Sequence, residues 1–140
     1  MFQTGIARDV LCKAQVAPAN RTAMTAIKGA GVARGQRSRA LMIFYVGVTG
    51  AATTADFKVQ QSDTDVDGNY ADVAGAAAVQ IGASQTNLVG MVECTVTKSY
   101  VRCVHTPDGT VANGILGGCH LILFSADAVP ETNDPVAVAV

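Results

Sequence analysis

The feature that most constrains the fold is a series of short apolar or alternating runs, each about as long as a β-strand and each followed by turn-forming residues. Residues 40–48 form a continuous apolar run rich in β-formers, which predicts a strand buried on both faces. Residues 57–60 and 70–73 alternate apolar and polar side chains around a turn at residues 63–69, which predicts a hairpin. Strands of this length separated by turns indicate an all-β protein, an antiparallel sandwich or a barrel-like body.

Three further strands are predicted closer to the C-terminus, over residues 88–97, 100–105 and 119–124. The Thr-Pro-Asp-Gly sequence at residues 106–109 has the composition of a tight turn and is expected to end the second of them. Helix is expected for no more than a turn or two. The side chains expected to contribute to the core are Phe44, Val46, Val59, Val92, Val101, Leu121 and Leu123.

The charged residues are divided unevenly along the chain. Seven of the ten basic residues, but one of the eleven acidic residues, lie within the first 40 positions. Pro18 and several glycines interrupt this segment, so residues 1–39 are predicted to form an extended basic arm. Residues 40–125 are predicted to form the β-sandwich body, and residues 126–140, with Pro130 and Pro135, an extended C-terminal tail.

A basic arm and an acidic body can attract one another between copies, or attract a different acidic protein. The arm and tail residues expected to contact a neighbouring protein are Arg8, Lys13, Arg34, Arg37, Arg39, Val136, Val138 and Val140. Charged residues make up 15% of the chain, a low fraction for a surface that faces only water. The composition therefore also favours burial against another protein.

Residues 63–69 place Asp63, Asp65 and Asp67 at alternate positions before Gly68, as in the first half of a calcium-binding loop. Such a loop also needs a bidentate glutamate at its twelfth position, and that position is Ala74. An ordinary hairpin turn is therefore favoured over a calcium site.

Two pairs of soft ligands, Cys103 with His105 and Cys119 with His120, lie on neighbouring predicted strands. Alternation places the first pair on one face of its strand and the second pair on opposite faces, a poor arrangement for tetrahedral zinc. The chain has two histidines and no recognisable nucleophile or phosphate-binding motif. We therefore expect no enzyme, no metal and no cofactor.

Nucleic acid and membrane are also disfavoured as partners. The basic arm lacks an aromatic side chain between Phe2 and Phe44 on which a base could stack, and the acidic body would repel phosphates. No run reaches the length of about 18 apolar residues that spanning a bilayer requires. The N-terminus lacks the apolar region of a secretory signal. We expect assembly in a cytoplasm, with the four cysteines as free thiols.

Residues 56–63, the short acidic turn, residues 70–73 and residues 97–102 with the glycine-rich strand after them resemble small head structural proteins of tailed bacteriophages. These proteins include capsid decoration, or cement, proteins. The resemblance covers roughly residues 40–125, and residues 1–39 have no counterpart in it. It implies a virion structural protein that binds the outside of a shell of major capsid protein and clamps neighbouring capsomers. It also implies a location on the capsid surface after assembly in the host cytoplasm.

Two other interpretations stay open. A head-completion, connector or tail component of the virion would have a similar fold and would assemble as a ring with a fixed number of subunits. A carbohydrate- or receptor-binding β-module would use exposed aromatic side chains, and the chain has no tryptophan and three tyrosines.

Overall fold

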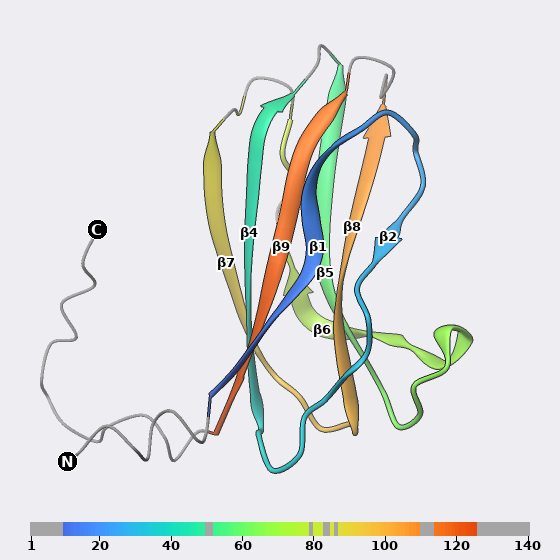
Figure 1. Cartoon of the computed structure of the whole chain (residues 1–140), viewed down its shortest axis with the longest axis vertical. Coiled ribbons are helices and arrows are strands. Elements are labelled where there is room, and N and C mark those ends of the chain that lie inside the picture. Colours follow the sequence, from blue (N-terminus) through green and yellow to red (C-terminus); the bar gives the residue numbers. More distant parts are fainter. Residues whose placement is uncertain are drawn as a thin grey trace, which may run out of the picture.

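The chain folds as a β-sandwich, in which two antiparallel sheets pack face to face (Figure 1). The computed structural model describes residues 10–49, 52–78, 80–82, 85, 87–109 and 114–125. Within these ranges the helical structure is one 3₁₀ turn, η1 (Asp67–Asn69), and no helix is long and apolar enough to cross a membrane. The predicted all-β architecture is confirmed, as a two-sheet sandwich.

In the described part of the chain, sheet A contains four strands in the order β1-β9-β4-β7, each antiparallel to its neighbours. Their bounds are β1 (Leu11–Arg21), β4 (Arg39–Thr49), β7 (Leu88–Thr95) and β9 (Ile115–Phe124). β4 contains the long apolar run and lies inside the sheet, between β9 and β7. β1 and β7 form the two edges.

Sheet B is built around β8 (Tyr100–Gly109), which pairs along its whole length with β5 (Thr53–Ser62). β5 also pairs with β6 (Ala71–Ala77), which completes the hairpin predicted around residues 63–69. On its other side, β8 pairs with two short strands, β2 (Ile27–Lys28) and β3 (Val32–Ala33). β6 therefore lies at one edge of sheet B, and β2 and β3 lie at the other.

Aromatic and branched side chains from both sheets fill the space between them. Phe44 of β4 stacks on Phe57 of β5 with ring centroids 4.8 Å apart, and Phe57 stacks on His105 of β8 at 4.4 Å. The prediction of the core is confirmed, since six of its seven members are buried and Val92 is half-buried against the same cluster. The six buried members are Phe44, Val46, Val59, Val101, Leu121 and Leu123.

The prediction of a separate arm over residues 1–39 is wrong for the part of it that the structure describes. β1 pairs with β9 in sheet A, and its Val16 is buried in the core. β2 and β3, from the same segment, extend sheet B. Pro18 and two register shifts in β1, on either side of Val16, break the alternation by which a strand is recognised in a sequence.

The turn predicted at residues 106–109 is also wrong, because β8 continues to Gly109. Pro107 pairs with Ala55 of β5, whereas the pairing of β8 with β2 ends at His105. Among the described strands, β8 therefore has a neighbour on one side at Pro107. A proline, which has no N–H to donate, is tolerated at such a position.

Residues 40–48 were expected to be buried on both faces of their strand, and the structure buries them on one face. The side chains that point between the sheets are buried: Ala40, Met42, Phe44 and Val46. Leu41, Ile43 and Tyr45 alternate with them and are partly exposed on the opposite face of sheet A. An apolar surface therefore lies on the outside of the sandwich.

Candidate assembly surface

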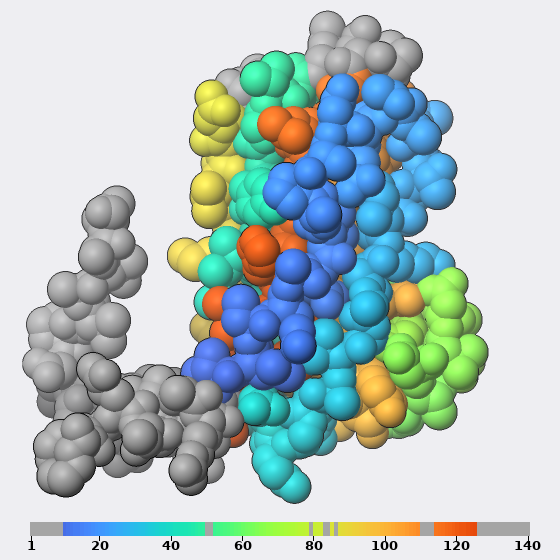
Figure 2. Space-filling model, viewed as in Figure 1, coloured from blue at the N-terminus to red at the C-terminus, as the bar shows by residue number. Residues whose placement is uncertain are grey.

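The outer face of sheet A is assembled from rows of side chains that cross all four strands. In one row, Ile43 of β4 lies beside Met91 of β7 and His120 of β9, and His120 lies beside Ala14 of β1. In the next row, Leu41 lies between Glu93 of β7 and Ile122 of β9. Figure 2 shows this face, with β7, β4, β9 and β1 side by side in yellow, green, orange and blue.

Apolar side chains dominate these rows. We call the surface they form the sheet A face; its members are Cys12, Ala14, Leu41, Ile43, Tyr45, Val89, Met91, Leu116, His120, Ile122 and Phe124. Among the described residues of the outer rows, the charged pair is Arg39 and Glu93, which form a salt bridge with each other. Little charge is therefore left to hold water on this surface.

Two glycines allow large side chains to lie flat on the sheet A face. Tyr45 lies over Gly118 of β9, where a Cβ atom would come within 2.6 Å of the Tyr45 hydroxyl oxygen. Leu116 lies over Gly47 of β4, where a Cβ atom would come within 2.7 Å of the leucine side chain. Tyr45 also lies beside His120, with ring centroids 5.9 Å apart, and its partial burial raises the pKa of its hydroxyl. The resulting surface is broad and has few projecting groups.

Several side chains of the sheet A face are well exposed. Val89 and Met91 on β7 are 68% and 66% exposed, and Leu116 on β9 is 41% exposed. Single exposed apolar residues are ordinary, but neighbouring ones on one face mark a site of contact with another molecule. The sheet A face therefore has the composition of a protein interface.

The outer face of sheet B is polar, and its charges are paired within the chain. Lys58 of β5 donates to Asp72 of β6 at 2.8 Å, which lowers the pKa of Asp72. The guanidinium of Arg102, on β8, donates to Asp67 at 2.6 Å and lies 3.9 Å from the centre of the Tyr70 ring. Because these charged groups are paired within the chain, covering the outer face of sheet B with another protein would stabilise the molecule less than covering the outer face of sheet A.

The acidic loop at residues 63–69 directs its carboxylates to three different places. Asp63 pairs with Lys98 at 2.6 Å, and Asp65 accepts a hydrogen bond from the Tyr70 hydroxyl at 2.7 Å. Asp67 accepts hydrogen bonds from the side chains of Lys28 and Arg102. These bonds lower the pKa of Asp67, and the bond from Lys28 has the larger effect. Within the described ranges, no group of three or more acidic, histidine or cysteine side chains is placed to hold a metal ion.

The cysteines and histidines considered as zinc ligands have different surroundings. His105 is buried and stacked on Phe57, whereas His120 lies on the sheet A face. Cys103 and Cys119 are buried in the core, where a hydrogen bond between their thiols raises the pKa of Cys103 and lowers that of Cys119. Both cysteines pack as part of the apolar core.

The structure gives the predicted contact residues different surroundings. Arg34 donates to the backbone carbonyls of Thr97, Lys98 and Arg37, so it fastens the segment before β4 to the connection between β7 and β8. Arg37 donates to the Arg34 carbonyl. Arg39 pairs with Glu93, and Lys13 is exposed on β1. Arg8, Val136, Val138 and Val140 lie outside the described residues.

Basic residues of the N-terminal part of the sequence form ion pairs with acidic residues of the rest of the same chain. Lys28 pairs with Asp67 of the acidic loop, and Arg39 pairs with Glu93 of β7. The charge division therefore helps to join the N-terminal strands to the rest of the sandwich. Sequence reasoning missed the sheet A face, although a signal was present: Leu41, Ile43 and Tyr45 are apolar at the outward positions of β4.

Comparison with known proteins gives a weak likeness of fold. No family model matches the chain, and no curated protein matches it. A chain in the structure of infectious bursal disease virus, Gx strain, is 8% identical with a TM-score of 0.49, over 83% of this chain and 33% of that chain. A chain from Bacillus endospore appendages, described as a novel family of disulfide-linked pili, is 18% identical with a TM-score of 0.40, over 84% of this chain and 88% of that one. At these values neither likeness carries an argument about function.

Proposed function

We propose that the protein is a structural subunit that binds other protein through the sheet A face, as a capsid decoration protein of a tailed bacteriophage. The observation that carries the proposal is the contrast between the two outer faces. Sheet B presents paired charges, whereas the described residues on the outer face of sheet A form an apolar surface with one ion pair, Arg39–Glu93. The resemblance of residues 40–125 to small phage head proteins supports the choice of a capsid.

The sheet A face suits attachment to a repeating lattice. Fully burying one valine, leucine or methionine side chain stabilises a complex by about 1.5–3 kcal/mol before the losses of entropy on association are counted. Contacts of this size, repeated over many copies on a shell, give strong overall attachment from modest individual affinity. The partners in this proposal are the major capsid protein and neighbouring copies of the chain.

In this proposal the protein performs no catalysis and is located on the capsid surface of the virion, after assembly in the host cytoplasm. Residues of an open, flat and apolar sheet do not converge on a substrate, which is consistent with a structural role. The histidine on the sheet A face, His120, lies beside Tyr45 with the two rings tilted relative to one another.

A head-completion, connector or tail component is the second candidate. The observation in its favour is the regular edge of β7 in sheet A, which has no further strand partner among the described residues. Pairing of a strand from one copy with the edge of the next is a head-to-tail contact, and such contacts close into rings when the rotation between copies permits it.

The number of copies per virion tests the proposal and separates the two candidates. Quantitative mass spectrometry of purified particles should find the chain in hundreds of copies, on the order expected of a repeated lattice position. A dozen or so copies, on the order of a single ring, would favour the connector or tail component. Absence from the particles would contradict both.

A variant experiment connects this test to the sheet A face. Ile43→Lys places a charge at the centre of the face and should lower incorporation into particles at least tenfold. Met24→Lys is the matched control, because Met24 is 60% exposed on the connection between β1 and β2 and should be incorporated normally. Normal incorporation of Ile43→Lys would show that the sheet A face is not the contact.

A further inference from the structure

β7 differs from the other edge strands of the sandwich. Its pairing with β4 runs without a register shift from Leu88, opposite Val46, to Thr95, opposite Arg39. In sheet A, β4 is its one neighbour among the described strands. These eight residues therefore form an edge without a register shift, and their backbone groups that point away from β4 have no strand partner within the described chain.

The other edges carry features that prevent a further strand from pairing. β1 contains Pro18 and two register shifts. The pairing of β6 with β5 contains a register shift, and β6 contains Gly75 with a φ of +73°. β2 and β3 are two residues long each. Natural proteins block their edges with such bulges, prolines and short strands. β7 has none of them, and its exposed Val89 and Met91 are apolar.

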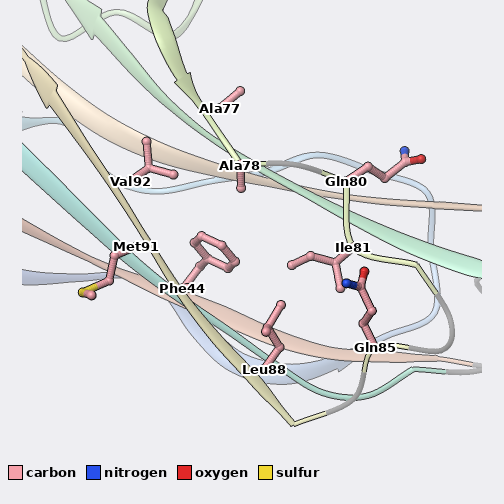
Figure 3. A pocket seen from close by; sticks show the side chains of 10 residues that line it. Phe44, Ala77, Ala78, Gln80, Ile81, Gln85, Leu88, Met91 and Val92 are labelled. Carbon is pink, nitrogen blue, oxygen red and sulfur yellow. The ribbon is translucent and has the colours of Figure 1, made fainter. Parts of the chain in front are cut away.

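A groove runs beside the edge of β7. It has a volume of about 350 Å³, which is large enough for several side chains. Figure 3 shows the Phe44 ring pointing into it, with Leu88, Met91 and Val92 on one side and Ala78 and Ile81 on the other. Gly90 of β7 makes this possible, because a Cβ atom at Gly90 would collide with the Phe44 ring. A strand added to β7 could therefore place an apolar side chain against Phe44.

The chain carries a segment with the matching composition. Residues 136–140, which lie outside the described residues, read Val-Ala-Val-Ala-Val and have no charged side chain. As an added strand this segment would place its three valines on one face and its two alanines on the other. β-branched residues also favour strand pairing.

The length of the C-terminal segment and the place where β9 ends allow this segment to reach another molecule. β9 ends at Phe124, opposite Arg39, the end of sheet A at which β7 also ends. The ten residues 126–135 can span up to about 35 Å when extended. Pro130 and Pro135 favour an extended backbone for the residues that precede them.

We propose that β7 accepts residues 136–140 of a neighbouring copy as an added strand, with a valine of that strand against Phe44. The backbone groups of β7 would then be paired, and the groove would be filled. The contact rests on the proposed function and deepens it, because it identifies a second copy of the chain as a direct partner. Since the donor and acceptor surfaces differ, the contact is head-to-tail and links copies in series.

A chain that ends at residue 135, together with a synthetic peptide of residues 134–140, tests the proposal. Hydrogen exchange should slow at least tenfold over β7 (Leu88–Thr95) when the peptide is added, and should change little over β1, the other edge of sheet A. The matched control is the same peptide with Val138→Asp, which should give no protection because it would place a carboxylate on the valine face. Binding without protection of β7, protection of β1 instead, or no binding of the peptide would each overturn the proposal.

Measurements on the full chain separate this proposal from the proposed function. The full chain should self-associate, and Val138→Asp should weaken the association while Ile43→Lys in the chain ending at residue 135 leaves peptide binding intact. A monomeric full chain whose β7 is already protected would show that the chain's own tail occupies the edge, which overturns supply by a neighbour. Failure at β7 with normal incorporation into particles would leave the sheet A face as the contact.

Discussion

At the scale of single residues, Arg102 holds the outer surface of sheet B together. It is 5% exposed, its Nη1 donates to Asp67, and its Nε and Nη2 donate to the Gln60 side-chain oxygen at 2.9 and 2.8 Å. We expect Arg102→Ala to lower the free energy of unfolding by about 2–4 kcal/mol, because charge-assisted hydrogen bonds and packing on Tyr70 are lost together. Urea unfolding measures this loss.

The matched control is Lys58→Ala, which removes a partly exposed ion pair with Asp72. Exposed pairs contribute about 0–1 kcal/mol each, so this variant should be nearly as stable as the natural chain. Equal losses in the two variants would mean that burial adds nothing to the interactions of Arg102.

The cysteines should differ in reactivity. Cys12 is exposed, whereas Cys94, Cys103 and Cys119 are buried, and burial raises the pKa of Cys94 to about 11. Because the thiolate is the reactive form, one thiol per chain should react quickly with a thiol reagent under native conditions. Four should react after unfolding without reductant. A count of two or none after unfolding would indicate disulfides.

His105 should make stability depend on pH in a defined window. Its Nδ1 lies 3.3 Å from the Asp56 carbonyl, its Nε2 has no hydrogen-bond partner among the described residues, and burial lowers its pKa. The unfolded chain then binds a proton at a higher pH than the folded chain does. Stability from this residue is therefore complete above about pH 6.5 and falls as the pH drops through the lower folded-state value.

Urea unfolding between pH 7.5 and 5 measures this slope. Asp67 and Asp72 also have lowered pKa values, but they lose their contribution below about pH 4, outside this window. His105→Leu should abolish the slope between pH 6.5 and 5. If the His105→Leu variant keeps the pH dependence of stability, another titratable group causes it.

At the scale of elements, β1 is a strand that the sequence did not predict and that we expect the fold to require. Val16 lies in the core, and β1 covers the edge of β9, whose Leu121 and Leu123 are buried. Deleting residues 1–21 should therefore leave a chain that is unfolded or aggregated by circular dichroism and light scattering. Deleting residues 1–9 keeps β1 whole and should leave a cooperative unfolding transition. A folded chain without β1 would show that the remaining three strands of sheet A suffice.

Most of the strands could be predicted from the sequence, and the shortest ones could not. β4 and β7 were predicted close to their observed positions, because their apolar runs are regular and bounded by turns. β5, β6 and β9 were predicted in the right places, but each extends about four residues beyond one end of the predicted range. β2 and β3 are too short to have a period. The sheet A face was harder to predict than the strands. A continuous apolar run such as that of β4 is expected to be buried on both faces of its sheet, whereas the outward face of β4 is partly exposed. Arg34 was expected to bind a neighbour, and backbone carbonyls that no sequence pattern reveals are its partners.

At the scale of the whole molecule, the two outer faces of the sandwich have opposite character. On sheet B, ion pairs such as Lys58–Asp72 and Arg102–Asp67 satisfy the charges within one copy. On sheet A, Ile43, Met91 and Val89 face outward without polar groups to shield them. A molecule of this kind is more stable when its apolar face is covered, and a second sandwich offers an equally apolar surface.

The most direct test is the molar mass of the purified full chain, measured by light scattering from low to high micromolar concentration. The chain and the Met24→Lys control should both rise above the mass of a monomer, 14.3 kDa. Ile43→Lys should rise less, because it keeps the contact at β7 and loses the contact through the sheet A face, and its circular dichroism spectrum should be unchanged. If the full chain is monomeric at every concentration, or if Ile43→Lys associates as strongly as the control, the sheet A face is not the surface through which the copies bind one another.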